Sequence, residues 1–404
     1  MFKQKFNVPD GWRLCKLTDV AHVKFSGVDK KTEPAEGLVR LCNYTDVFYN
    51  RYILNDLDFM RATATSGEIE KFRLKKGDVV FTKDSETAEE IGICASVEEE
   101  LDNVICGYHL GIMRPKRNNV NGSYLSAVLN FHPIHWQFVR MANGITRFGL
   151  NLPAMDMVMV PIPPINEQVE IIDVIKTWDS CIEKTDRLLK AINSRHQALS
   201  VKLLSKVEHE IPLKRFLKLV LRAVKKPEDT YWALGIRSHG RGTFRRFIEN
   251  PSTVAMDTLY RVLHDDLIVN ITFAWEGAVA LVNRNDEDCF VSHRFPTFEI
   301  DRKKALPDYL RHVIVQKRFI RNLGMISPGG AGRNRVLNKR DFLNLKISLP
   351  EIGEQQRIGD ILNTSLREIS LLQTKIELLK KQKSGLMQKI FTGEWRVKSG
   401  KEVT

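Results

Sequence analysis

The sequence predicts an α+β protein in which two globular domains with small sheets alternate with two long helices that pair as a coiled coil. The first observation is a repeat: residues 167–205 and 354–392 carry the same apolar pattern, and a shift of 187 residues superimposes them. The second is that similar turns precede both segments, Pro163-Pro-Ile-Asn-Glu167-Gln168 and Pro350-Glu-Ile-Gly-Glu354-Gln355. A helix of this length extends roughly 58 Å. That is too long for a compact core, so each apolar stripe needs a partner, and the other copy is the obvious one.

Apolar residues in both segments recur at alternating steps of four and three, which is typical of a coiled-coil seam. His196 and Lys383 occupy the same polar position in the two copies. A polar group there can fix the register, and exposed coil ends are the alternative explanation. The predicted apolar seam residues are Ile171, Ile175, Trp178, Ile182, Leu189, Ile192, Leu199, Leu203, Ile358, Leu362, Ile369, Leu372, Ile376, Leu379, Leu386 and Ile390.

Length and composition indicate a protein of several folded domains. The chain has 404 residues and 43% hydrophobic content, enough for two to four real cores. No run approaches the roughly 18 to 20 apolar residues of a membrane span, and no signal peptide follows the first residues, so we expect a cytoplasmic protein. The six cysteines stand singly, which favours reduced thiols over a zinc site or a disulfide framework.

The net charge of +13 is unevenly distributed along the chain. Residues 1–205 sum to zero, whereas residues 212–350 alone carry +11. A strongly basic region indicates a polyanionic partner, most simply nucleic acid. A basic but inert surface is the alternative.

The first globular domain is predicted over residues 1–161. Short apolar runs at 79–81, 91–94 and 104–106 are typical of strands in a mixed or mainly antiparallel sheet, and residues 124–129 and 134–141 of short helices. A glycine-bearing loop follows at 142–149. Prolines at 161–164 end the domain, because proline lacks an amide donor and disfavours helix in the preceding residue. Residues 162–207 form the first long-helix segment, with Asn166 as its predicted N-cap.

The second half of the chain repeats this order. The second globular domain is predicted over residues 208–349, and residues 350–404 hold the second long helix and a polar tail. Residues 263–269 echo residues 74–80, with an acidic turn residue before a β-branched strand. A glycine loop at 328–335 stands where 141–148 stood. The period is far longer than a solenoid repeat, so we interpret the chain as a duplicated domain-plus-helix module.

Together these features resemble the specificity subunit of type I restriction-modification systems. Two different globular segments alternate with two similar long helices. Each helix is preceded by a Pro-x-x-x-Glu-Gln turn, and each turn by an apolar strand and a Gly/Arg loop. The resemblance covers essentially the whole chain.

The resemblance implies a non-catalytic subunit that recognises DNA. Each globular segment would be a target recognition domain that reads one half of a split sequence, and the helices would pair antiparallel as a spacer that fixes the gap. Two methyltransferase subunits would dock along the helices and modify an adenine in each half-site, and motor-nuclease subunits would complete the restriction complex. The chain itself would hold no cofactor, since the methyl donor, ATP and Mg²⁺ are expected only on the partner subunits.

Candidate DNA contacts are chosen by residue chemistry, since the family's domains share no fixed base-reading motif. Arginine can bind guanine edges or phosphates, asparagine can bind adenine, and glycine lets the backbone approach a groove. Such residues gather at 237–246, at 329–335, at 143–147 and at 30–44, and an ordinary solvated surface is the alternative for each. The predicted DNA-binding residues are Arg237, His239, Arg241, Arg245, Arg246, Arg333, Asn334, Arg335, Asn143, Thr146, Arg147, Lys30, Lys31, Asn43 and Tyr44.

Enzymatic alternatives lack their motifs. The sequence contains no Asn/Asp-Pro-Pro-Tyr/Phe methyltransferase tetrapeptide, no Walker lysine and no Gly-x-Ser-x-Gly elbow. Asp78 and Lys83 lack the downstream Glu-x-Lys pair of a nuclease. His109 and His293 lack metal-ligand spacing, which favours a structural role. The remaining alternative is a coiled-coil scaffold or adaptor of another defence complex, whose basic domain binds RNA or acidic protein.

Overall fold

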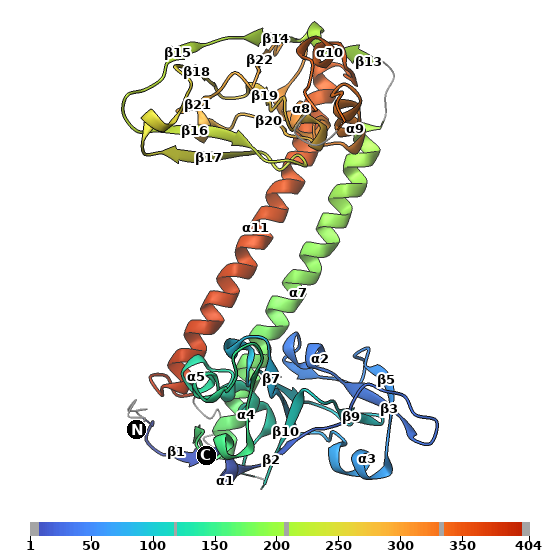
Figure 1. The fold of residues 1–404 in the computed structure, drawn as a ribbon, viewed down its shortest axis with the longest axis vertical. Helices are drawn as coiled ribbons and strands as arrows, with labels where there is room; N and C mark the ends of the chain where they lie inside the picture. Colours follow the sequence, from blue (N-terminus) through green and yellow to red (C-terminus); the bar gives the residue numbers. More distant parts are fainter. Residues whose placement is uncertain (1–7, 117–118, 206–209, 331–334, 398–404) are drawn as a thin grey trace, which may run out of the picture. The chain divides into compact units, whose positions relative to one another are not determined.

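The computed structural model describes residues 8–116, 119–205, 210–330 and 335–397 (Figure 1). The chain divides into two compact units. Unit 1 comprises the residues up to 185 and those from 375 onwards, and unit 2 comprises residues 186–374. Each unit therefore contains one globular domain together with part of both long helices.

The globular part of unit 1 mixes short strands and short helices. Its strands are β1 (Arg13–Lys16), β2 (Ala21–Phe25), β3 (Gly37–Cys42), β4 (Tyr52–Ile53), β5 (Met60–Ala64), β6 (Val79–Thr82), β7 (Asp84–Ser85), β8 (Cys94–Val97), β9 (Val104–Cys106), β10 (Leu110–Pro115), β11 (Phe148–Gly149) and β12 (Met159–Ile162). Its helices are α1 (Leu17–Val20), α2 (Tyr44–Phe48), α3 (Ser66–Phe72), the 3₁₀ turn η1 (Ala88–Glu90), α4 (Gly122–Leu129), α5 (His132–Met141) and α6 (Leu152–Met155).

A five-stranded sheet in the order β2-β10-β6-β8-β4 lies at the centre of unit 1, beside a three-stranded sheet in the order β5-β3-β9. Every residue of β6 is buried, as expected for a strand covered on both faces. The β2–β10, β10–β6 and β6–β8 pairs are antiparallel, whereas β4–β8 and β3–β9 are parallel. The strand predicted at 91–94 is wrong, because Gly92 adopts a φ of 78° and turns the chain, so that β8 begins only at Cys94.

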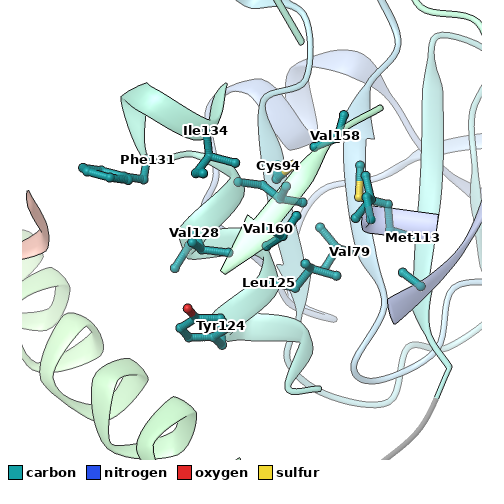
Figure 2. Packing of buried hydrophobic residues seen from close by; sticks show 14 of the residues in the cluster. Val79, Cys94, Met113, Tyr124, Leu125, Val128, Phe131, Ile134, Val158 and Val160 are labelled. Carbon is teal, nitrogen blue, oxygen red and sulfur yellow. The ribbon is translucent and has the colours of Figure 1, made fainter. Parts of the chain in front are cut away.

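The core of unit 1 joins the sheet to both long helices. Figure 2 shows part of it, with Leu125 of α4 beside Val79 of β6 and Val160 of β12. Residues from the ends of the long helices belong to the same buried cluster, so the globular domain and these helix ends share one core. They are Ile171, Ile172, Ile175, Met387, Ile390 and Phe391.

Unit 2 follows a similar plan. Its strands are β13 (Glu210–Pro212), β14 (Leu217–Val220), β15 (Ala223–Lys225), β16 (Tyr231–Ile236), β17 (Thr243–Ile248), β18 (Thr258–Arg261), β19 (Leu267–Val269), β20 (Val279–Leu281), β21 (Cys289–Val291), β22 (Thr297–Ile300) and β23 (Lys346–Ser348). Its helices are η2 (Leu213–Arg215), η3 (Pro251–Thr253), η4 (Ala274–Glu276), η5 (Arg284–Asp286), α8 (Pro307–Val313), α9 (Lys317–Met325) and α10 (Lys339–Asn344).

The strands of unit 2 form a four-stranded sheet, β14-β22-β19-β20, and a five-stranded sheet, β15-β18-β21-β16-β17. A two-stranded pair, β13-β23, lies next to the long helices in sequence. The main core contains Phe298, Tyr309 and Phe342 together with Ile358 and Leu362 of the second long helix. This globular domain therefore also shares its hydrophobic core with a long helix.

The two long helices are α7 (Ile165–Leu204) and α11 (Ile352–Phe391), each of 40 residues (Figure 1). Salt bridges link Asp179 to Lys383 within unit 1 and Arg195 to Glu368 within unit 2. In unit 1, Ile171 shares a core with Ile390, and Asp179, later on α7, pairs with Lys383, earlier on α11. In unit 2, Arg195 pairs with Glu368, and Leu203, later on α7, shares a core with Ile358, earlier on α11. The helices therefore run antiparallel within each unit. None of the predicted seam residues is exposed. Among the described helices, none combines the length and apolar character needed to cross a bilayer.

A buried glutamine joins each long helix to the domain before it. Gln168 accepts a bond from the Asn121 amide at 2.8 Å, and its Nε2 donates to the Asn119 and Pro163 carbonyls at 2.9 and 2.8 Å. This explains why the Glu-Gln turn is repeated. The N-cap prediction is wrong: α7 begins at Ile165, so Asn166 lies inside its first turn.

Gln355 reproduces this joint in unit 2. It accepts a bond from the Leu306 amide at 2.8 Å and donates to the Lys304 and Pro350 carbonyls at 2.9 and 2.8 Å. Both glutamine side chains are almost completely buried, at 0% and 1% exposure. The two joints therefore satisfy the same three kinds of backbone group in the same way.

Candidate nucleic-acid interface

A hairpin at the edge of a sheet carries most of the predicted contacts of unit 2. Strands β16 and β17 pair antiparallel, and β17 is the outermost strand of its sheet. The turn between them needs three residues with positive φ, namely His239 at 63°, Gly240 at 65° and Gly242 at 76°. Glycine adopts this region at little cost, so the sequence Ser-His-Gly-Arg-Gly favours the tight turn. The side chains of Arg237, His239 and Arg241 are all exposed on it.

Two arginines stand between two phenylalanines along β17, in the sequence Phe244-Arg245-Arg246-Phe247. The Arg245 guanidinium lies 4.7 Å from the Trp232 ring centroid, and Trp232 and Phe247 lie 4.9 Å apart. Successive residues of a strand face opposite sides, so Arg246 faces away from Arg245. It lines a hollow of about 260 Å³ together with Phe244. The side chains of Arg245 and Arg246 therefore project from opposite faces of the edge strand.

The 3₁₀ turn η4 holds the hairpin in place. The His239 amide donates to the Glu276 carbonyl at 2.7 Å, and the Gly240 amide donates to the Gly277 carbonyl at 3.0 Å. The Ser238 hydroxyl donates to the Glu276 carboxylate at 2.6 Å. The arginine-rich turn is thus fixed to the body of the domain, which limits the entropy lost on binding.

Arg335, at the end of the predicted glycine loop, contacts the same 3₁₀ turn. Arg333 and Asn334 lie outside the described residues. Arg335 is half-buried, and its guanidinium lies 5.1 Å from the Trp275 ring centroid of η4. It also donates to the Ser327 and Gly324 carbonyls at 3.1 and 2.9 Å. Two of its donor groups are therefore occupied within the domain.

In unit 1, the loop at 143–147 is the most exposed of the predicted contact segments. Asn143, Thr146 and Arg147 are all exposed, and Ile145 is 94% exposed. The loop is closed at its base by the Asn143–Gly149 bridge and by the pairing of β11 with β7. It therefore presents several side chains from a fixed base.

Tyr44 meets that base from another part of the chain, and Asn43 precedes it in sequence. Asn43 caps α2, and its amide donates to the Asp46 carboxylate at 2.7 Å. The Tyr44 hydroxyl lies 3.1 Å from the Ser85 hydroxyl on β7 and donates to Glu90 of η1 at 3.3 Å. The structure therefore brings the two predicted groups of unit 1 together around β7 and η1. Lys30 and Lys31 are exposed on the loop after β2, and the Lys30 charge acts on Asp46 of α2.

Several further side chains lie at these surfaces that were not among the DNA contacts predicted from the sequence. The Lys83 ammonium lies 4.7 Å from the Tyr108 ring centroid, and His109 Nδ1 lies 3.3 Å from the Asp84 carboxylate, beside the loop base. In unit 2, Trp232 and Phe247 are 39% and 44% exposed. The Phe-Arg-Arg-Phe sequence of β17 was the available signal, because exposed aromatic rings beside arginine are typical of nucleic-acid surfaces.

Neither polar position of the helix seam is exposed. Lys383 is 4% exposed, and its ammonium pairs with Asp179, which also accepts a bond from the Tyr52 hydroxyl at 2.9 Å. Burial lowers the pKa of Lys383 and raises that of Tyr52. His196 is half-buried in unit 2, with its ring 6.4 Å from that of His312.

Within the described residues, no group of three or more His, Cys, Asp or Glu side chains could hold a metal ion. Burial raises the pKa of the Cys42, Cys94 and Cys106 thiols, so these sulfurs are protonated and unreactive at neutral pH. Exposed arginines on loops of both units are typical of the class of nucleic-acid-recognition proteins.

Comparison with known proteins assigns the family. The sequence matches the type I restriction modification DNA specificity domain over residues 9–194 and 266–381. The chain belongs to this family, whose members are the DNA-recognition, non-catalytic part of type I restriction-modification systems. The resemblance inferred from the duplicated helices and turns is therefore confirmed.

Relatives and solved structures agree over nearly the full length. The chain is 21% identical over 420 residues to a Methanocaldococcus jannaschii protein provisionally described as the type I restriction enzyme MjaX specificity subunit, covering 97% of this chain and 95% of that one. The S subunit of the M. genitalium type I system has a TM-score of 0.56 at 12% identity, covering 96% and 97% of the two chains. The HsdS subunit from Thermoanaerobacter tengcongensis has a TM-score of 0.52 at 15% identity, covering 98% and 100%. The structural likenesses show that the fold is shared.

Proposed function

We propose that the chain reads a bipartite duplex DNA sequence, one half through the globular domain of unit 1 and the other through that of unit 2. One observation carries the proposal: in each unit, contact segments from distant parts of the chain converge on an equivalent 3₁₀ turn. In unit 1, Tyr44 bonds to Glu90 of η1, and the base of the 143–147 loop pairs with β7, which directly precedes η1. In unit 2, the 237–242 turn and Arg335 contact η4. We assign residues 1–161 and 208–349 as the two reading domains.

Electrostatic attraction contributes more to DNA binding in the second domain than in the first. The second carries most of the net charge, so phosphate neutralisation and arginine contacts to bases contribute strongly there. The first belongs to a half with no net charge and relies on a local contact surface around Arg147 and Asn143. Binding to the second half-site should therefore depend more steeply on salt concentration.

The long helices serve as spacer and docking surface in this proposal. An antiparallel helix pair of fixed length would set the number of unread base pairs between the half-sites. Two methyltransferase subunits would dock along it, and restriction subunits would join the complex, as expected for a specificity subunit. The methyl donor, ATP and Mg²⁺ would then be bound by those partners, and the assembly would act in the cytoplasm.

Selection from a random duplex library with the full-length chain tests the proposal. The expected result is a motif of two short specific sequences separated by an unread gap of constant length, with affinity that falls steeply as salt rises. A matched random single-stranded RNA library is the control. Preference for RNA, or a single uninterrupted DNA motif, would contradict the proposal and favour a scaffold with a basic RNA-binding domain.

A further inference from the structure

Helices α5 and α9 occupy equivalent places in the two units. Each follows a short helix, α4 or α8, and their first residues, His132 and Lys317, are 185 positions apart in the sequence. Each also leads into one of the glycine loops described above. Neither helix contributed a residue to the contacts predicted from the sequence.

In unit 2, α9 connects the two predicted contact segments. At its start, a Cβ atom added to Gly240 of the hairpin turn would lie 2.9 Å from Val315. In its first turns, Ile320 packs so closely on Gly277 that an added Cβ there would lie 3.0 Å from it. At its end, Arg335 donates to the Gly324 carbonyl at 2.9 Å. The hairpin turn, α9 and Arg335 therefore form one continuous surface.

In unit 1, α5 is fixed in the same way. His135 Nε2 donates to the Ile91 carbonyl at 2.8 Å, next to η1. The Phe138 ring fills the space beside Gly92, where an added Cβ would lie 2.6 Å from it. The helix ends at Met141, and the exposed loop at 143–147 follows directly. The inner face of α5 is thus anchored, and its outer face adjoins the loop.

The outer faces of both helices present three exposed residues at four-residue steps. They are His132, Trp136 and Arg140 on α5, and Lys317, Arg321 and Met325 on α9. Residues at this spacing lie on one face of a helix. Trp136 is 41% exposed and Met325 70%. Equivalent positions thus carry different chemistry on the same scaffold, as required of elements that read two different half-sites.

We propose that α5 and α9 are the recognition helices of the two domains, each entering the major groove of its half-site and reading it with these three residues. The inference rests on the proposed function. The groove admits a single α-helix, and helices of 10 and 9 residues extend only about 14 to 15 Å. Lys317 and Arg321 are cationic donors suited to the acceptor edge of guanine. Trp136 and Met325 offer apolar contact for a thymine methyl group.

Selection from the random duplex library, repeated with Arg321→Gln, tests the inference. The expected result is a relaxed or altered preference in one half-site only, with affinity for the wild-type sequence reduced by about 5- to 150-fold. Trp136→Ala should alter the other half-site. Arg302→Gln is the matched control, because Arg302 is exposed, lies outside α9 and pairs with Asp265 at 2.6 Å. It should leave the motif unchanged.

A grafted helix face provides the second test. Lys317→His, Arg321→Trp and Met325→Arg together place the α5 residues on α9, and all three positions are exposed, so the fold should persist, as circular dichroism can verify. The second half-site should then shift towards the first. Wild-type motifs from the Arg321→Gln, Trp136→Ala and grafted proteins would overturn the inference while leaving bipartite reading intact. Absence of a bipartite motif with the unaltered chain would overturn the proposed function and this inference with it.

Discussion

Acidification from neutral pH is expected to destabilise unit 2, because His312 is buried there as an uncharged imidazole. Its side chain is 4% exposed. Its Nε2 group donates to Asn363 Oδ1 at 2.9 Å, and Asn363 Nδ2 in turn donates to Asp308 at 3.0 Å. Burial lowers the pKa of His312 to about 4, and the nearby His196 and Arg311 act in the same direction.

The size of the effect follows from the two states of the imidazole. In the unfolded chain His312 titrates at its ordinary pKa of about 6.5. The unfolded state therefore binds the proton more tightly than the folded state. The contribution of His312 is fully present above pH of about 6.5 and is lost as the pH falls through the folded pKa. The difference between the two pKa values corresponds to about 3 kcal/mol of unfolding free energy.

Urea denaturation between about pH 4.5 and 7.5, with hydrogen exchange of α8 peptides to report on unit 2, measures this dependence. The variant His312→Gln removes the titrating group and should flatten the pH dependence by most of that amount. His293→Gln, at an exposed position, is the matched control and should retain the wild-type curve. Equal pH slopes for His312→Gln and wild type would refute the argument.

Three further changes test other parts of the structure. Asp179→Ala leaves the Lys383 ammonium buried without its carboxylate. The free energy of unfolding of unit 1, measured by urea denaturation, should fall by about 3 to 5 kcal/mol. A fall of less than about 1 kcal/mol would mean that water reaches the pair. Gln355→Ala leaves three buried backbone groups without a hydrogen-bond partner and should lower the free energy of unfolding by at least about 2 kcal/mol. Gln356→Ala, at the exposed neighbouring position, should leave it nearly unchanged. Deleting one heptad from each long helix should change the unread gap by about three base pairs, since seven residues rise about 10.5 Å and a base-pair step about 3.4 Å. A constant gap in duplex selection would exclude the helices as the spacer.

The long helices were predictable because their signal is periodic and repeated. A periodic apolar pattern over about forty residues predicts a helix even when single positions depart from it. The observed helices begin only two residues before the predicted segments. The ends of the helices were harder to predict, because they depend on single residues. Asn166 has the chemistry of an N-cap, yet α7 starts before it. The buried Gln168 joint outweighs the local preference for a cap.

The reading surfaces were predictable only in part. Arginine and glycine composition identified the loops, but their convergence depends on contacts between distant residues, such as that from Tyr44 to Glu90. The packing of Arg335 against Trp275 has no local signal either. The faces of α5 and α9 were missed because a short helix with three outward residues looks like any amphipathic surface helix. Gly92 shows the opposite limit, since one residue with positive φ converted a predicted strand into a turn.

The glutamine joints have a consequence for how such proteins can diversify. Gln168 and Gln355 bond only to main-chain amides and carbonyls of the domains they hold. Every residue type supplies those carbonyls, and every type except proline supplies the amide, so the joint places almost no demand on the side chains of the attached domain. A domain of quite different sequence can fasten to the same helix, provided that its backbone follows the same path. The joint therefore does not depend on which DNA sequence the attached domain recognises.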